Sequence, residues 1–182
     1  MHVTCFPAQT TYPGGQQMCS SASTAMCALM TLLPADRALP DTTVLDAIMR
    51  NAAQVHACIR RHGEHLLTVA DVIRRTNLAQ WMQSRNAHSR YREVGGLVHG
   101  TPTDMRTDHC MDLGDLLQQL SDNACCTLTC HAHTVSVGRR RRQWWLCDSL
   151  PGEFVCCDNL QALQARLRCI MPSALEYSAV VF

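Results

Sequence analysis

The hydrophobic pattern of this chain changes from a helical to a strand-like period after Asn123, and this change constrains the fold more than any other feature. Before Asn123 the apolar residues recur mainly at helical spacing, whereas the segments CCTLTCHAHTVSV, QWWLCDS and EFVCC that follow are typical of strands. The turn residues Pro151 and Gly152 separate the last two segments. Helices followed by consecutive antiparallel strands predict an α+β domain.

Several elements can be assigned to residue ranges. We expect helices over 19–33, from a cap at Asp41 to about His62, after Thr68, from Asp112 to Leu120, and from a cap at Asp158 or Asn159 through Leu167. The segment EYSAVVF at the C-terminus predicts one more strand. Residues 77–108 carry little periodicity and predict loops with one or two short strands.

The composition limits the classes of protein to which the chain can belong. With 182 residues and 47% hydrophobic residues, we expect a single domain over 1–182, monomeric, with a substantial core. A net charge of +1 gives no indication of nucleic-acid binding. The sequence shows no membrane span and no signal peptide, so we expect an intracellular protein in a reducing compartment. The apolar run at 180–182 fits a domain excised from a longer protein.

Twelve cysteines invite two interpretations. Most of them can be reduced core residues, because a thiol behaves as a small hydrophobic side chain. The competing interpretation is a structural zinc site, since four cysteine and histidine positions crowd between Cys125 and His131, with His133 following. The chain has no CxxC pair, which structural zinc sites usually contain, so we predict no metal and no other cofactor.

Cys19 is the candidate nucleophile. It is predicted to lie in the first turn of the helix over 19–33, where unpaired backbone N–H groups and the helix dipole favour an anion. Such a position lowers the pKa of a thiol and raises the fraction of thiolate. The thiolate is the form that attacks an acyl carbon.

A histidine and an acid that could complete the site lie near the end of the chain. His133 begins an alternating strand, and Asp148 ends the next strand across a hairpin. We therefore expect Asp148 to accept a hydrogen bond from the imidazole and to orient it. His131 shares the predicted strand face with His133 and is the alternative base.

An oxyanion hole requires hydrogen-bond donors, and the segment ahead of Cys19 offers several. The candidates are Gln9, Gln16, Gln17 and the backbone N–H of Cys19 itself. Each residue also has a structural explanation when it is taken alone: the cysteine in the core, the histidine in a sheet, the aspartate in a turn. The combination of helix-leading cysteine, strand histidine and strand-ending aspartate favours the catalytic interpretation.

The residues that carry this pattern also resemble known families. The stretch HTVSVGRRRRQWWLCDS is similar to the His-to-Asn segment of papain-like peptidases and of Josephin-type deubiquitinases. The stretch AQTTYPGGQQMCSSASTAMCALM resembles the start of the deubiquitinase domain of the herpesvirus large tegument protein. This resemblance implies a papain-like cysteine protease fold, Cys19 as nucleophile, Gln9 as oxyanion-hole donor and Asp148 as the acid of the triad.

The implied activity is cleavage after the C-terminal glycine of ubiquitin or a ubiquitin-like protein, which would be the partner. If the protein is viral, the resemblance places it in the host cytoplasm or nucleus or in the virion tegument. Gly95, Gly96 and Trp145 are the predicted substrate-binding residues, and the arginine run 139–142 could border the same channel.

One position departs from the tegument pattern. That family ends the strand with Asp-x-His and uses this histidine as base, whereas the matching position here is Leu150. Either His133 is the base, in the papain-like order, or the domain is an inactive ubiquitin-binding pseudoenzyme. A papain-like protease for another substrate and a zinc-binding interaction module are further alternatives.

Overall fold

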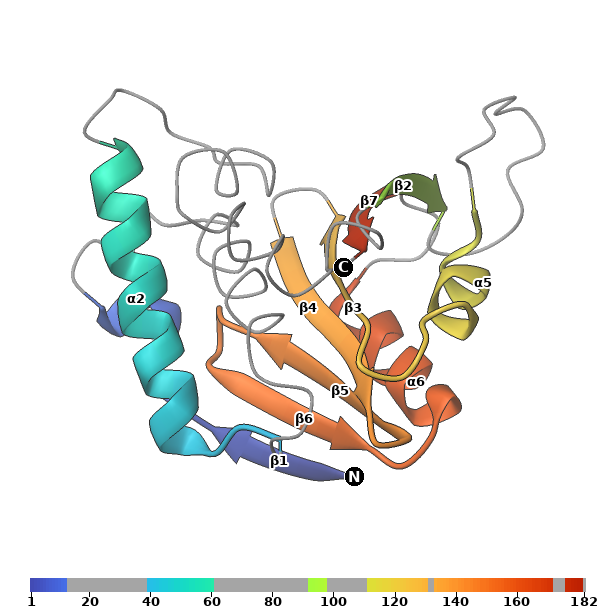
Figure 1. The fold of residues 1–182 in the computed structure, drawn as a ribbon, viewed down its shortest axis with the longest axis horizontal. Helices are drawn as coiled ribbons and strands as arrows, with labels where there is room; N and C mark the ends of the chain where they lie inside the picture. Colours follow the sequence, from blue (N-terminus) through green and yellow to red (C-terminus); the bar gives the residue numbers. More distant parts are fainter. Residues whose placement is uncertain (13–38, 61–91, 98–110, 131–132, 172–175, 182) are drawn as a thin grey trace.

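A computed structural model of the chain describes residues 1–12, 39–60, 92–97, 111–130, 133–171 and 176–181. Their strands form a seven-stranded sheet in the order β1-β6-β5-β4-β3-β7-β2, and all neighbours are antiparallel (Figure 1). The strands are β1 (His2–Cys5), β2 (Arg92–Leu97), β3 (Cys125–Cys130), β4 (His133–Arg140), β5 (Gln143–Asp148), β6 (Glu153–Cys157) and β7 (Glu176–Val181).

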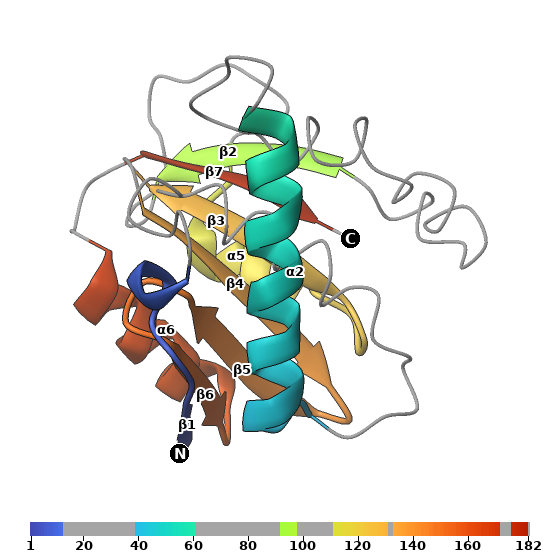
Figure 2. The same cartoon turned by 90° about the vertical axis from the view of Figure 1, so that its left-hand side faces the viewer.

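Helices cover both faces of this sheet. Helix α2 (Thr42–Arg60) lies on one face, while α5 (Leu113–Gln118) and α6 (Leu160–Ile170) lie on the other (Figure 2). A short 3-10 helix, η1 (Gln9–Thr11), follows β1. None of the helices in the described ranges is both long and apolar enough to cross a membrane.

Side-chain caps define where the described helices begin. Asp41 accepts a hydrogen bond from the N–H of Val44 (2.9 Å), and Asp112 accepts one from the N–H of Gly114 (2.7 Å). Asn159 caps α6, since its side chain accepts from the N–H of Ala162 (2.8 Å). These caps confirm the predicted starts of the three helices and select Asn159 over Asp158.

The strands predicted from alternation are present, but the segment CCTLTCHAHTVSV forms two antiparallel strands, β3 and β4, instead of one. A short strand, β2, lies within 77–108. Strand β7 enters the sheet between β3 and β2. Strand β1 was not predicted, because its four residues are mostly exposed and form a run too short to give a clear strand signal. The predicted helices over 19–33 and after Thr68 lie outside the described residues.

Strand alternation distributes the crowded cysteines between two separate cores. The core beneath α5 and α6 contains Cys126, Cys130 and Cys157. The core beneath α2 contains Cys125, Cys147 and Cys156. Within the ranges that the structure describes, no three side chains of His, Cys, Asp or Glu come together in a way that could hold a metal ion.

The arginine run forms the β4–β5 hairpin turn. Arg140 pairs with Gln143, and both Arg141 (φ 49°) and Arg142 (φ 64°) have positive φ, as a type I′ turn requires. This turn lies at the far end of β4 from His133, about 23 Å away for seven residues at about 3.3 Å each. The arginines therefore lie at the opposite end of this hairpin from His133, and their place along a substrate channel stays a prediction.

The β5–β6 turn fixes the segment that leads to η1. Phe6 donates its N–H to the carbonyl of Gly152 (2.8 Å), and Gln9 donates its N–H to the carbonyl of Ser149 (2.9 Å). Gly152 has a φ of 76°, and a Cβ there would lie 2.9 Å from the nitrogen of Ala8. Glycine is thus required twice at this position, for its conformation and for the close approach of the 6–8 segment.

Candidate active site

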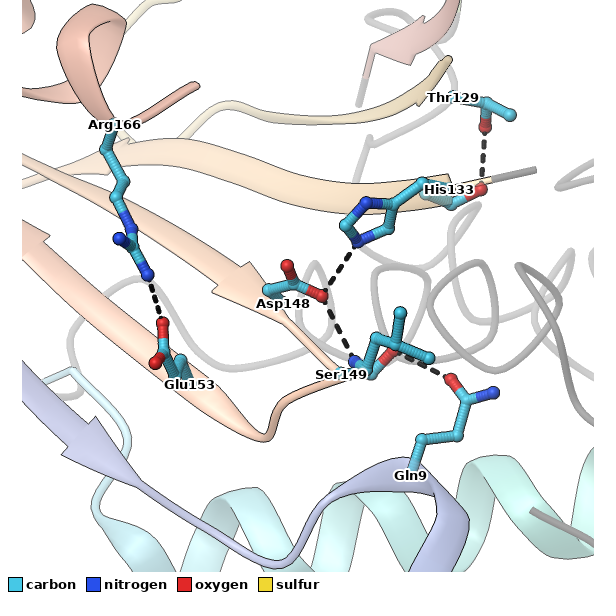
Figure 3. Close-up of polar contacts among 9 residues, drawn as sticks. Gln9, Thr129, His133, Asp148, Ser149, Glu153 and Arg166 are labelled. Atoms are coloured by element: carbon cyan, nitrogen blue, oxygen red, sulfur yellow. Dashed lines mark hydrogen bonds and ion pairs between the residues drawn. The ribbon is translucent and has the colours of Figure 1, made fainter. Parts of the chain in front are cut away.

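His133 and Asp148 meet at one end of the sheet. His133 is the first residue of β4 and Asp148 is the last residue of β5, and the register of these strands places the two ends side by side. The Nε2 atom of His133 lies 3.0 Å from Oδ1 of Asp148 (Figure 3). The carboxylate is buried, whereas 29% of the histidine side chain is exposed. The sheet therefore presents an oriented, accessible imidazole.

The contact with Asp148 determines which nitrogen of His133 can act as a base. An ionised carboxylate only accepts hydrogen bonds, so Nε2 carries the proton that is donated to Asp148. In the neutral ring the lone pair is then on Nδ1. Nδ1 is the atom that could take a proton from a thiol.

The same contact shifts the protonation equilibrium of the imidazole. The hydrogen bond to Asp148 raises the pKa of His133, its partial burial opposes this rise, and the negative charge of Asp148 adds to it. The net effect stabilises the imidazolium. An imidazolium is the ion-pair partner that keeps a nearby cysteine ionised.

Asp148 accepts a backbone hydrogen bond and lies opposite another carboxylate in the sheet. Its Oδ1 also accepts a hydrogen bond from the backbone N–H of Leu150 (3.1 Å). The residue opposite Asp148 on β6 is Glu153, whose carboxylate forms an ion pair with Arg166 of α6 (Figure 3). Arg166 compensates the charge of Glu153, the carboxylate nearest to Asp148 in the sheet register.

Gln9 reaches the same end of the sheet from η1. It is 3% exposed, and its Oε1 accepts a hydrogen bond from the hydroxyl of Ser149 (3.0 Å), which is also buried (Figure 3). Ser149 directly follows Asp148. The structure thus brings three of the predicted site residues, Gln9, His133 and Asp148, to one end of the sheet.

The predicted nucleophile Cys19, the alternative base His131, and Gln16 and Gln17 lie outside the described residues. Among the described cysteines, Cys130 is in register with His133. It is buried, and burial raises the pKa of its thiol. Burial likewise raises the pKa values of Cys156 and Cys157. These three thiols are poor nucleophiles at neutral pH.

The predicted substrate-binding residues have structural explanations. Trp145 is 5% exposed and stacks on Phe154, with ring centroids 5.7 Å apart. Gly95 accepts a hydrogen bond from the N–H of Met111, and a Cβ on Gly96 would clash with the backbone of Met111. Both glycines lie on β2, at the edge of the sheet, with three strands between β2 and β5. Their assignment to substrate binding, like that of Trp145, stays a prediction.

Leu150, where the tegument pattern has its histidine, is 50% exposed. Its side chain cannot transfer a proton. It is one of three large hydrophobic side chains that the described ranges expose, together with Met1 and Val3. Its backbone N–H nevertheless contributes to the site through the hydrogen bond to Asp148.

Sequence reasoning missed two contributors to this site. Ser149 contacts Gln9 across 140 positions of the sequence, and Arg166 reaches Glu153 from α6. The signal for Ser149 was its place directly after the predicted acid, at a strand end followed by a Pro-Gly turn. Arg166 carried no local signal, because an arginine on an amphipathic helix is usually solvated.

Comparisons with known proteins place this arrangement in a known fold. No protein-family model and no curated protein sequence matches the chain. Among solved structures, the chain is similar to the ubiquitin-specific protease encoded by a murine cytomegalovirus tegument protein, crystallised with a ubiquitin-based suicide substrate. The TM-score is 0.68 at 16% identity, covering 100% of this chain and 85% of the viral one. A weaker match is the Pseudomonas avirulence protein AvrPphB, with TM-score 0.46 and 10% identity over 91% and 94% of the two chains.

The first of these similarities confirms the predicted fold class and the resemblance to the herpesvirus tegument enzyme at the level of fold. The likeness extends over the whole chain, although few residues are identical. The protein has the α+β, papain-like cysteine protease fold of the cytomegalovirus ubiquitin-specific protease.

Proposed function

We propose that this protein is a cysteine protease that hydrolyses the bond after the C-terminal glycine of ubiquitin or a ubiquitin-like modifier. The observation that carries the proposal is the buried carboxylate of Asp148 bonded to the accessible imidazole of His133, with Gln9 at the same end of the sheet. The fold shared with a viral ubiquitin-specific protease supports the same reaction class.

In this mechanism Cys19 attacks the carbonyl carbon of the terminal glycine. His133 takes the thiol proton through Nδ1 and later donates it to the leaving amine, while Asp148 holds the ring by Nε2. The amide of Gln9 and the backbone N–H of Cys19 donate hydrogen bonds to the oxyanion. Water then hydrolyses the thioester, with His133 acting as general base.

A second candidate function follows from Leu150. Because this exposed leucine occupies the position of the histidine in the tegument pattern, the domain could bind ubiquitin without cleaving it. The contact between His133 and Asp148 favours the enzyme, since a binding domain has no use for a buried carboxylate that orients an imidazole.

The experiment that separates the two candidates uses ubiquitin with an electrophile at its C-terminus. We expect a covalent adduct with the intact protein, no adduct with Cys19→Ala and a strongly slowed reaction with His133→Ala. Cys130→Ala is the matched control, because Cys130 lies opposite His133 but is a buried, poorly ionised thiol. His131→Ala tests the alternative base.

An adduct that still forms with Cys19→Ala but is lost with Cys130→Ala would show that Cys130, and not Cys19, is the nucleophile. Binding of ubiquitin without any adduct would favour the pseudoenzyme. If an adduct forms only with another ubiquitin-like modifier that carries the same electrophile, the proposed chemistry is supported but the substrate is that modifier and not ubiquitin.

A further inference from the structure

We infer that Ser149 is a positioning residue for the proposed oxyanion donor: its hydroxyl sets the orientation of the Gln9 side-chain amide. The inference rests on the proposed function for its catalytic consequence. Its structural basis is the hydrogen bond from the Ser149 hydroxyl to Oε1 of Gln9, between two buried side chains (Figure 3).

The orientation of this amide decides whether Gln9 can serve an oxyanion hole. One end of a glutamine amide only accepts hydrogen bonds and the other end only donates them. Because Oε1 is turned toward Ser149, the donating Nε2 is turned away from it (Figure 3). A rotation of the amide by 180° would exchange the two ends and present an acceptor, which repels an oxyanion, in place of the donor.

Ser149 is held in a fixed position beside Gln9. Its carbonyl accepts the N–H of Gln9 at 2.9 Å, so main chain and side chain both join the two residues. The two residues that flank Ser149 are also joined, because the carboxylate of Asp148 accepts a hydrogen bond from the backbone N–H of Leu150. Ser149 is the first residue of the β5–β6 turn and directly follows Asp148, so two neighbouring residues at one strand end bind different partners.

The tripeptide 148–150 therefore connects the two halves of the proposed machinery. Asp148 orients the base and Ser149 orients the oxyanion donor. A shift of this turn would disturb both at once, and Gly152, which lets the 6–8 segment approach closely, keeps it in place.

A double-mutant cycle tests the inference. Hydrolysis of ubiquitin with a fluorogenic group at its C-terminus is measured for the intact protein, Ser149→Ala, Gln9→Ala and the double variant. We expect kcat to fall about 100-fold in Gln9→Ala, as for loss of one oxyanion donor. In Ser149→Ala we expect kcat to fall about tenfold, which is the effect of losing one neutral hydrogen bond, while KM stays unchanged. The double variant should be no slower than Gln9→Ala, because Ser149 acts through Gln9.

Ser136→Ala is the matched control. Ser136 is equally buried on the neighbouring strand β4, but its hydroxyl has no hydrogen-bond partner within the described part of the chain. Loss of this hydroxyl should leave kcat within twofold of the intact protein. An unchanged kcat in Ser149→Ala would overturn the inference. So would a double variant in which the separate effects of Ser149→Ala and Gln9→Ala on kcat multiply.

Nuclear magnetic resonance of the Gln9 side-chain NH₂ group tests the structural part without any activity. In the intact protein and in Ser136→Ala we expect two resolved proton resonances that exchange slowly with solvent. In Ser149→Ala they should shift and exchange faster, and an unchanged spectrum would contradict the inference. If the intact protein neither forms the adduct nor hydrolyses the substrate, the proposed function fails and the catalytic part of the inference fails with it.

Discussion

At the scale of single residues, the candidate site depends on one buried carboxylate. Asp148 accepts hydrogen bonds from His133 and from the backbone of Leu150, and it is the group that raises the pKa of His133. The imidazolium is thereby stabilised in the folded protein relative to the unfolded chain. This contribution to stability is fully present below the unfolded pKa of about 6.5 and is lost as the pH rises through the higher folded pKa.

Asp148→Asn should therefore lower the pKa of His133. The amide keeps the shape of the side chain but removes the negative charge, while the opposing effect of burial remains. The measurement is an NMR titration of the His133 ring in both proteins. Relative to the intact protein, Asp148→Asn should lose more stability at pH 5 than at pH 9. An equal or higher pKa in the variant would show that Asp148 does not control this histidine.

At the scale of secondary-structure elements, the caps and turns account for most local features. Asp41, Asp112 and Asn159 are side-chain caps that can be identified from the sequence. The turn at 141–142 is the exception. Two arginines adopt positive φ where a type I′ turn favours Asn-Gly, and such a conformation costs about 1–3 kcal/mol for a residue with a Cβ.

Arg142→Gly should raise the free energy of unfolding by about 1 kcal/mol, because glycine adopts positive φ without a steric penalty. The backbone hydrogen bond from residue 142 to Asp122 (3.0 Å) does not depend on the side chain. Denaturant unfolding measures the change. Arg142→Ala is the control, since it removes the charge but keeps the Cβ and should give no such gain. Equal stabilisation by both variants would indicate charge repulsion instead of backbone strain.

At the scale of the whole molecule, the sheet separates two cores and hides most of the described thiols. The six cysteines on its central strands are buried: Cys125, Cys126, Cys130, Cys147, Cys156 and Cys157. Two others, Cys5 and Cys169, are exposed. These eight cysteines are free thiols.

Brief alkylation of the native protein, followed by mass spectrometry of its peptides, should modify Cys5 and Cys169 and leave the six buried cysteines unmodified until the protein is unfolded. The physical reason is that a thiol must reach solvent before it can react. Modification of Cys130 as fast as that of Cys5 would contradict the described packing. Cys19 should react faster than Cys5 if it is the activated nucleophile.

The sequence by itself determined the features that depend on neighbours along the chain. Strand alternation predicted the segments that form β3 to β6, side-chain caps predicted the starts of α2, α5 and α6, and the hairpin between His133 and Asp148 predicted their meeting. A tight hairpin brings such ends together without help from the rest of the fold.

The tertiary structure decided what depends on long-range contacts. Strand β1 exists because it pairs with β6, and β7 enters the sheet between β3 and β2, which no local pattern specifies. The cysteines that crowd in the sequence are distributed between two faces, because neighbours on a strand point in opposite directions. Gln9 contacts Ser149 only because the fold brings together residues that are 140 positions apart, and no local sequence pattern predicts such a contact.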